Sequence, residues 1–455
     1  MNKVSGSFRD PSGFLFEDSG SLLRQVNRSY RNEYDLLVGS GLYEVLKKKG
    51  MLIPHRELDG HAGLTDEAYK IIQPERIPFI SYPYEWSFTQ LQDAALMTLN
   101  IQKIALDHGM SLKDASAYNI QFHNGKPVFI DSLSFERYEE GRPWVAYGQF
   151  CRHFLAPLAL MSYSDVRLSR LLQIHLDGLP LDMVSAMLPW RTRFSFSLLI
   201  HIHLHAASQK KYKNKPGAAK MASISKNRLH SLIVGLKLAA ERLRIRGQHT
   251  EWANYYTFTN YSDASFNHKK KVLSSMLKNS EPDVVWDLGA NTGIFSQIAA
   301  DMGARCIAFD IDPLAVDAGY RFIKKNKTSN LLPLVIDLTN PSPGIGWNHN
   351  ERMSLKHRNL PDTVLALALI HHLAISDNIP LEMIARFMHD ICSNLIIEFV
   401  PKSDSQVQKL LASRKDVFPE YHEEGFRKAF EKYFEILEVV RVDESDRTLF
   451  RMRKR

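Results

Sequence analysis

The 455-residue sequence predicts an α/β protein whose C-terminal part is a doubly wound, mostly parallel sheet and whose N-terminal part is a mixed α+β region. Three observations predict this fold class. From residue 284 onward, short apolar strands alternate with helices, which is typical of a parallel sheet covered by helices. The last two apolar segments flank a short polar turn, which predicts an antiparallel hairpin that closes the sheet. Before residue 206, long helical segments are mixed with short hairpins instead.

The N-terminal elements follow one another in a less regular order. Residues 13–26 predict a hairpin, residues 30–50 and 87–109 predict helices, and residues 118–133 predict a second hairpin. The turn of this second hairpin is expected at Asn124-Gly125, because that dipeptide tolerates the left-handed backbone of a tight turn.

A basic stretch separates the two halves of the chain. Residues 206–230 contain seven Lys or Arg residues and no acid, with small residues and one Pro-Gly pair, which indicates a solvated linker. Residues 229–243 then show apolar side chains at the spacing of a bridging helix. We therefore expect a mixed α+β domain over residues 1–205, a linker and bridging helix over 206–250, and the sheet domain over 251–455.

The C-terminal domain alternates strands and helices along its length. Strands are predicted at residues 284–289, 305–312, 331–338, 363–370 and 393–400, helices at 294–303, 313–326 and 379–392, and the closing hairpin at 435–453. Because parallel strands end at one edge of the sheet, polar residues at those ends are expected to meet in one crevice.

The composition excludes several function classes. Apolar residues make up 44% and charged residues 24% of the chain, which is ordinary globular usage and excludes whole-chain disorder. Cys151, Cys306 and Cys392 lie far apart, which argues against a disulfide framework or a CxxC zinc site and favours a reducing compartment. Neither a secretory leader nor a long apolar span is evident, so we expect a cytoplasmic protein without a membrane partner. The net charge of +8 permits acidic partners without demanding them.

The strongest motif follows the first C-terminal strand. That strand ends at Asp287, and a turn bounded by Gly289 and Gly293 opens the next helix, so that backbone N–H groups can meet a ligand at the sheet edge. The following strand ends at Asp310, where a carboxylate can hold both hydroxyls of a ribose. A glycine turn alone could be a simple tight connection, but Asp310 and Asp337 at two further strand ends favour a cofactor site.

The glycine spacing separates two cofactor classes. A dinucleotide fingerprint would need glycines at positions 291 and 294, which are Asn291 and Ile294. The segment instead resembles the DxGxxxG signature of class I S-adenosylmethionine-dependent methyltransferases, and the resemblance extends from Trp252 to the C-terminus. It implies a Rossmann-like sheet and S-adenosylmethionine as cofactor. The sequence departs from the family at Asn291, where glycine is commonest.

The resemblance also implies which residues meet the cofactor. Asp287 would lie near the methionine moiety, Asp310 would bind the ribose, and Asp337 would approach the adenine. The full set that it implies is Asp287, Gly289, Ala290, Asn291, Gly293, Asp310, Ile311, Asp337 and Leu338.

A proton acceptor is expected after the fourth strand, beside the cofactor methyl group. His371 and His372 stand there, and imidazole titrates near neutrality, so either could serve as general base for an oxygen or nitrogen acceptor. Equally, one could cap the strand and the other pack in the core. Glu398 on the fifth strand is a weaker candidate.

The acceptor is less defined by the sequence. The NPSP segment at 340–343 is similar to the NPPY loop of amino-group nucleic-acid methyltransferases, but it follows the third strand and not the fourth. A small-molecule or glycan acceptor is therefore favoured over nucleic acid. Aromatic residues before the sheet could form a flap over the site or pack the linker onto the domain; they are Trp252, Tyr255, Tyr256 and Tyr261.

A second motif lies in the N-terminal half. Asp114 and Asn119 are five residues apart, and Asp131 follows across the Asn-Gly turn. This pattern resembles the catalytic loop and metal-binding aspartate of the protein-kinase-like fold, especially aminoglycoside-type phosphotransferases. The resemblance implies Asp114 as catalytic base, with Asn119 and Asp131 holding magnesium on ATP. The sequence departs from it at Lys113 and at the DSL that replaces DFG, and Arg24 is the basic residue available on the early strands.

Three functions remain open at this stage. The first is methyl transfer, with the N-terminal domain recognising acceptor or nucleotide. The second is a phosphotransferase or bifunctional enzyme that uses Asp114, Asn119 and Asp131, and the third is a non-catalytic sensor of S-adenosylmethionine. A metal site at His201, His203 and His205 is disfavoured, because no further ligand residue is adjacent.

Overall fold

The computed structural model describes residues 1–212, 223–246, 263–412 and 415–455. The aromatic residues considered as a flap over the site, at 252–261, lie outside the described residues. Across the described ranges, the helices are too short or too polar to span a lipid bilayer.

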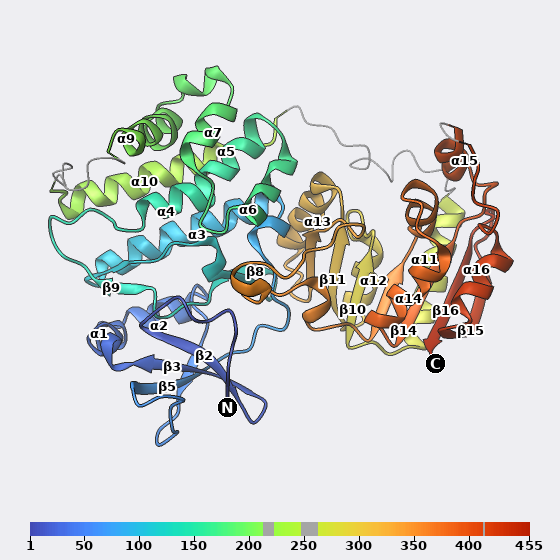
Figure 1. The fold of residues 1–455 in the computed structure, drawn as a ribbon, viewed down its shortest axis with the longest axis horizontal. Coiled ribbons are helices and arrows are strands. Elements are labelled where there is room, and N and C mark those ends of the chain that lie inside the picture. The colour runs from blue at the N-terminus through green and yellow to red at the C-terminus, as the bar shows by residue number, and fades with distance from the viewer. Residues whose placement is uncertain (213–222, 247–262, 413–414) are drawn as a thin grey trace. The chain divides into compact units, whose positions relative to one another are not determined.

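The chain folds into two units, each described here by itself (Figure 1). Unit 1 comprises Met1–Gln248 together with Gly344–Met353, and unit 2 comprises His249–Pro343 together with Ser354–Arg455. A ten-residue segment from the C-terminal half of the chain therefore folds with the N-terminal half.

Unit 1 contains an antiparallel sheet in the order β1-β2-β3-β5-β4. Its strands are β1 Asn2–Lys3, β2 Gly13–Asp18, β3 Ser21–Asn27, β4 His55–Glu57 and β5 Ala68–Pro74. The predicted first hairpin is β2–β3, with Ser19 and Gly20 at positive φ in its two-residue turn. The sheet buries Phe16 and Val26 in its core.

Two small two-stranded sheets follow in unit 1. They pair β6 Met110–Leu112 with β9 Phe135–Arg137, and β7 Ile120–His123 with β8 Lys126–Phe129. The turn between β7 and β8 lies at Asn124 and Gly125, whose φ angles of 51° and 72° confirm the predicted tight turn.

The remainder of unit 1 is helical. The helices are α1 Arg31–Gly39, α2 Leu42–Lys48, α3 Phe88–Asp107, α4 Tyr147–Phe150, α5 Ala156–Tyr163, α6 Leu171–Ile174, α7 Leu181–Met187, α8 Phe196–Leu198, α9 His205–Tyr212 and α10 Lys226–Arg242. The single helix expected over residues 30–50 is instead broken into α1 and α2, because Gly41 adopts a left-handed φ of 77°. The expected bridging helix is α10, and it packs within unit 1, where Gln92 of α3 donates to the carbonyl of Ala240 at 2.7 Å.

The inserted segment 344–353 is fixed in unit 1 by polar contacts. The Arg9 guanidinium lies 2.5 Å from the carboxylate of Glu351. The Met353 amide donates to the Tyr82 hydroxyl oxygen at 2.7 Å, and the Arg352 guanidinium lies 4.3 Å from the centre of the Tyr118 ring. These contacts make the segment part of unit 1 although it follows the third strand of unit 2.

Unit 2 contains a seven-stranded sheet in the order β12-β11-β10-β13-β14-β16-β15. Figure 1 labels five of its strands, β10, β11, β14, β15 and β16. Its strands are β10 Val284–Leu288, β11 Arg305–Asp310, β12 Leu331–Val335, β13 Thr363–Ala366, β14 Asn394–Phe399, β15 Phe434–Arg441 and β16 Thr448–Lys454. The first five are parallel, and β16 joins β14 and β15 antiparallel, which confirms the predicted fold class. The fourth strand is shorter than predicted, because the chain turns at Ala368, where φ is 50°.

Helices accompany this sheet along the chain. They are α11 Asp263–Lys278, α12 Ile294–Asp301, α13 Pro313–Asn326, α14 Leu381–Ile391, α15 Ser405–Ala412 and α16 Glu423–Phe430. The core between helices and strands contains Leu273, Val285, Ala299 and Ile396, all buried. Asp312 is the N-cap of α13, and its carboxylate accepts a hydrogen bond from the Leu314 amide at 2.8 Å.

Candidate cofactor and acceptor site

The carboxyl ends of β10, β11 and β13 border a cavity of about 350 Å³ in unit 2. Such a crevice is where open α/β sheets bind their ligands. The cavity is lined by Lys269, Asp287, Gly289, Ala290, Asn291, Phe295, Asp310, Ile311, Ile336, Asp337, Leu338, Thr339, Leu367, Ala368, Leu369, His372, Leu373, Ser376, Asp377 and Leu410. Eight of the nine residues predicted to meet the cofactor are among them. The ninth, Gly293, instead forms the left-handed N-cap of α12.

The turn after β10 has the backbone that its sequence requires. Gly289, Asn291 and Gly293 have φ angles of 76°, 52° and 82°. A Cβ atom on Gly289 would lie 3.2 Å from Leu369 Cδ1, so glycine keeps the cavity wall open at this point. Asparagine tolerates the left-handed region better than other non-glycine residues, which explains how Asn291 replaces the glycine that is commonest in the family.

Asp310 lies at the end of β11 and borders the cavity. One carboxylate oxygen accepts from the Asn291 amide at 2.7 Å, and the other accepts from the Asp312 amide at 2.9 Å. The Ile311 amide also hydrogen-bonds to this carboxylate. The two oxygens together offer about four acceptor positions, so one remains beyond these three amides. Burial raises the pKa of Asp310 to about 6. The carboxylate is therefore held in place with acceptor capacity left for a diol.

Two further aspartates border the same cavity. Burial raises the pKa of Asp287 to about 6, although its carboxylate accepts from the Ser296 hydroxyl at 2.6 Å. Asp337 accepts from the amide and the hydroxyl of Thr339, at 2.9 and 2.6 Å. The neighbouring Ile311 exposes 55% of its surface, which leaves an apolar face beside the aspartates. Carboxylates and an apolar face suit a cationic ligand that carries a ribose and a purine.

Comparison with known proteins identifies the family. A family model described as ribosomal protein L11 methyltransferase matches residues 271–349. The nodulation protein NoeA of Rhizobium meliloti (strain 1021) is 34% identical over 457 residues, which cover 98% of this chain and 95% of that protein. The chain belongs to the NoeA family. It is a class I S-adenosylmethionine-dependent methyltransferase, as the cavity, the strand order and the matching family model agree.

Solved structures with similarity to this NoeA-family chain include three methyltransferases. NodS, an N-methyltransferase from Bradyrhizobium japonicum WM9, is 13% identical, with 42% of this chain and 98% of that chain covered and a TM-score of 0.32. The magnesium protoporphyrin IX methyltransferase ChlM from Synechocystis PCC 6803 is 16% identical, with 45% and 93% covered and a TM-score of 0.33. The bifunctional kinase-methyltransferase WbdD is 15% identical, with 46% and 43% covered and a TM-score of 0.31.

The two candidate histidines of this NoeA-family chain occupy different places. His372 borders the cavity, whereas His371 is buried beside it, with ring centres 4.2 Å apart. Burial lowers the pKa of His372 to about 4 and lowers that of His371 well below its ordinary value, with a further contribution from the Arg447 guanidinium to each. Both rings are neutral at pH 7, and only His372 can meet a molecule in the cavity.

Sequence reasoning missed Lys269, which borders the cavity from α11. Its ammonium lies 2.6 Å from the Glu398 carboxylate, and both side chains are fully buried. The same carboxylate oxygen accepts from the Ala368 amide at 2.7 Å, which holds the turn after β13. Glu398, considered above as a proton acceptor, is thus engaged in an ion pair. One pattern in the sequence could have indicated this burial. Lys269 lies three residues after Phe266 and four before Leu273, which places it on the apolar face of α11.

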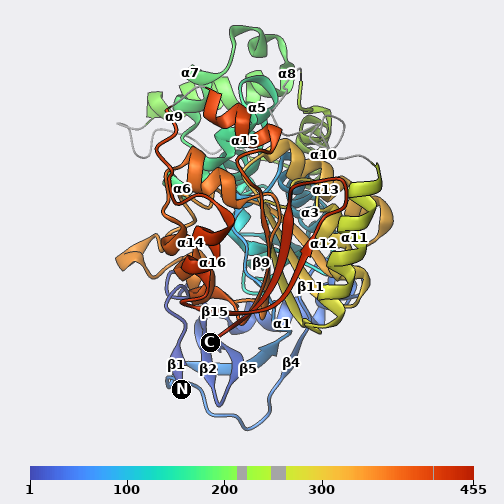
Figure 2. The same ribbon diagram turned by 90° about the vertical axis from the view of Figure 1, so that its right-hand side faces the viewer.

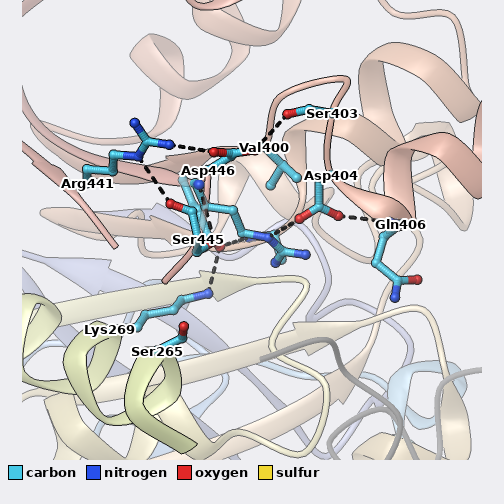
Figure 3. Close-up of polar contacts among 12 residues, drawn as sticks. Ser265, Lys269, Val400, Ser403, Asp404, Gln406, Arg441, Ser445 and Asp446 are labelled. Carbon is cyan, nitrogen blue, oxygen red and sulfur yellow. Dashed lines mark hydrogen bonds and ion pairs between the residues drawn. The ribbon is translucent and has the colours of Figure 1, made fainter. Parts of the chain in front are cut away.

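A second buried cation fixes the segments next to the cavity. The Arg447 guanidinium lies 2.8 Å from Asp404, which also accepts from the Gln406 amide at the start of α15. Figure 3 shows Asp404 and Ser403 facing the turn between β15 and β16, where Ser403 donates to Asp446 at 3.0 Å. These contacts position α15, which contributes Leu410 to the cavity wall.

In unit 1, the structure brings the three predicted residues together beside a fourth. Asp114 and Asn119 interact through their side chains, and Asn119 also donates to the Ser134 hydroxyl at 3.2 Å. Asp131 forms a mostly buried ion pair with Arg24 of β3. The Ser134 hydroxyl donates to Asp131 at 2.5 Å, so this carboxylate is engaged by side chains of its own unit.

The charge states of these two aspartates differ. Burial raises the pKa of Asp114. Burial alone would also raise the pKa of Asp131, but the Arg24 guanidinium and the Ser134 hydroxyl together lower it below its ordinary value. Among the described residues, no group of three or more His, Cys, Asp and Glu side chains is arranged to hold a metal ion.

Proposed function

We propose that this enzyme transfers the methyl group of S-adenosylmethionine to a small-molecule or glycan acceptor, and that unit 1 recognises that acceptor or a nucleotide. The observation that carries the proposal is that one cavity is lined by Asp310 and Asp337 together with His372, Ser376 and Asp377. Because the relative NoeA is named a nodulation protein, we propose that this chain also takes part in nodulation.

Each side chain proposed to meet the cofactor has a distinct role in this proposal. Asp310 accepts hydrogen bonds from the ribose hydroxyls, and Ile311 with Leu338 contacts the adenine ring beside Asp337. Asp287 and the turn from Gly289 to Asn291 face the methionine part, where Asp287 offsets positive charge. When bound, the cofactor supplies an activated methyl group on a sulfonium.

Other residues that line the cavity are suited to an acceptor. Leu369 and Leu373 exclude water, while Ser376 and Asp377 offer hydrogen bonds to a polar molecule. His372, neutral at pH 7, accepts a hydrogen bond from the acceptor and takes its proton as the methyl group is transferred. Because a pKa near 4 makes His372 a weak base, alignment of the acceptor contributes more to the rate than proton removal.

Transfer of a labelled methyl group tests the acceptor class. The full chain is incubated with S-adenosylmethionine carrying a radioactive methyl group and with separated glycan, small-molecule and nucleic-acid fractions of a bacterial extract. We expect label in the glycan or small-molecule fraction, and none with Asp310→Ala. Label confined to nucleic acid, or no formation of S-adenosylhomocysteine with any fraction, would contradict the proposal.

A second candidate function concerns unit 1. The convergence of Asp114, Asn119 and Asp131 beside Arg24 supports a nucleotide site of the phosphotransferase type, with Asp114 as base and magnesium held by Asn119 and Asp131. The engagement of Asp131 by Arg24 and Ser134 weighs against it. A thermal shift with magnesium and ATP that is lost in Asp131→Asn would support this candidate, and no shift in the parent chain would remove it.

A further inference from the structure

One end of unit 1 carries aromatic side chains that are largely exposed. Trp190, Phe194 and Phe196 expose 74%, 79% and 77% of their surfaces, and Met187 beside them is also exposed. We call these four residues the aromatic tip. Figure 2 shows α7 and α8, which flank the tip, at the end of unit 1 away from its antiparallel sheet. Several exposed aromatic residues within ten positions mark an interaction surface.

The tip is held in a defined conformation. The buried Thr192 hydroxyl donates to the Pro189 carbonyl at 2.6 Å and lies 3.0 Å from Nε2 of His203. The other ring nitrogen of His203 lies 2.7 Å from the Ser185 hydroxyl. His203, considered above as a metal ligand, therefore uses both ring nitrogens to join α7 and the turn before α8. The aromatic side chains are presented by a fixed turn, so little ordering is needed when they bind.

The charged residues within the tip are basic. Residues 187–196 contain two arginines and no Asp or Glu, and Asp182, near the start of α7, lines a hollow with Arg193. Arg191 and Arg193 alternate with the aromatic residues, and both are exposed. A partner that covers this surface must offer apolar contact together with negative charge.

We propose that the aromatic tip inserts into the surface of a negatively charged lipid bilayer, with Arg191 and Arg193 at the level of the headgroups. Exposed Trp and Phe next to arginines form the pattern of an interfacial membrane anchor. Trp190 and Phe194 meet edge to face, with 79° between their rings, so they present no parallel stack for the bases of a nucleic acid. Met187 adds an aliphatic surface of the kind that lipid chains contact. This inference is independent of the proposed function and would revise the expectation of no membrane partner.

Binding of the full chain to vesicles tests the proposal. Vesicles of phosphatidylcholine alone are compared with vesicles that contain 30% phosphatidylglycerol, by flotation. We expect at least tenfold tighter binding to the anionic vesicles, and at least a tenfold loss with the double variant Trp190→Ser, Phe194→Ser. The matched control is Val145→Ser, which removes another apolar side chain of unit 1 with 62% exposure and should change binding less than twofold.

Two further measurements distinguish a lipid partner from other partners. Arg191→Gln with Arg193→Gln should remove the preference for anionic vesicles, and quenching of fluorescence by brominated lipid should be lost in Trp190→Phe. All variants should keep the far-UV circular dichroism of the parent, because they alter exposed side chains. Equal vesicle binding by the parent and the aromatic double variant would overturn the proposal. Binding of single-stranded RNA that the double variant loses, without vesicle binding, would also overturn it.

Discussion

Asp310 of unit 2 ends a strand and Asp131 of unit 1 follows one, but the two units leave these aspartates in opposite electrostatic states. In unit 2, Asp310 is held by backbone amides at the border of a cavity, and its pKa is raised to about 6. In unit 1, Asp131 is paired with Arg24, and its pKa is lowered. The same residue type thus faces a ligand-sized space in one unit and is neutralised by its own unit in the other.

The direction of the pKa shift distinguishes a carboxylate that is available to bind a ligand from one that stabilises the fold. A raised pKa means that the folded protein holds the carboxylate at a cost that a cationic ligand can offset. A lowered pKa means that the fold itself already supplies the compensating charge. Lys269, which lines the cavity, forms its ion pair with Glu398 and not with Asp287 or Asp310.

The largest expected effect comes from breaking the buried pair of unit 2. Lys269→Met leaves the carboxylate of Glu398 buried without its partner, which should lower the free energy of unfolding by about 5 kcal/mol. Lys269→Met with Glu398→Leu should recover most of this loss, and the exposed Lys271→Met should cost little. Chemical denaturation of the full chain measures all three. A Lys269→Met protein as stable as Lys271→Met would show that the pair contributes nothing.

The ion pair of unit 1 should give a smaller effect of a different kind. Arg24 and Asp131 retain some solvent exposure, so Arg24→Met should cost about 3 kcal/mol of stability. The affinity for S-adenosylmethionine should not change, because the pair lies in the other unit. Denaturation and calorimetric titration of the same preparation measure both quantities. If Arg24→Met lost cofactor affinity without losing stability, the structural role assigned to the Arg24–Asp131 pair would be wrong.

Asp310 should behave in the opposite way. Asp310→Ala removes the acceptor proposed for the ribose hydroxyls and should weaken binding of S-adenosylmethionine about 100-fold, or about 2.7 kcal/mol, while the protein stays folded. Isothermal titration calorimetry measures the affinity, with the exposed Asp301→Ala as the matched control on α12. Unchanged affinity in Asp310→Ala would refute the assignment of this residue to the cofactor.

The pH dependence that each single carboxylate gives to cofactor binding should be the smallest effect. Asp287 and Asp310 both have pKa values of about 6 without ligand, and a carboxylate accepts hydrogen bonds from a diol and attracts a cation when ionised. Affinity should therefore rise as pH increases through 6, by about tenfold between pH 5 and pH 7 for each of the two carboxylates, and then level off. Titration calorimetry from pH 5 to pH 8 measures it, and Asp310→Asn should leave only the rise of about tenfold that comes from Asp287.

The same shifts predict the effect of pH on the ligand-free protein. Between about pH 4 and pH 6 the folded state holds protons on Asp287 and Asp310 that the unfolded state has lost, so these two groups make stability fall as pH rises through that range. The free energy of unfolding is measured from pH 4 to pH 6 for the parent and for Asp310→Asn. If it rose equally in both proteins, the raised pKa values would be contradicted.

The sequence predicted the sheet of unit 2 and the residues proposed to meet the cofactor because both follow from local patterns. The glycine turn and the aspartates at strand ends are readable from spacing, and they placed eight of nine residues at the cavity. Lys269 was not predictable in the same way, since its partner Glu398 is 129 positions away and a run of three lysines usually indicates a solvated face. The end of β13 was predicted too late because the hydrogen bond from Ala368 to Glu398 is equally non-local.

The insertion of residues 344–353 into unit 1 has a practical consequence for anyone who wishes to divide this enzyme. The polypeptide passes from one unit to the other three times, so a single cut near residue 250 separates no complete part from the rest. A truncated protein that begins there would carry Glu351 and Arg352 away from Arg9 and Tyr118, and the N-terminal fragment would expose the surface that they cover. Neither unit can therefore be replaced by a homologous domain through a single exchange of sequence, because each exchange would also remove part of the other unit.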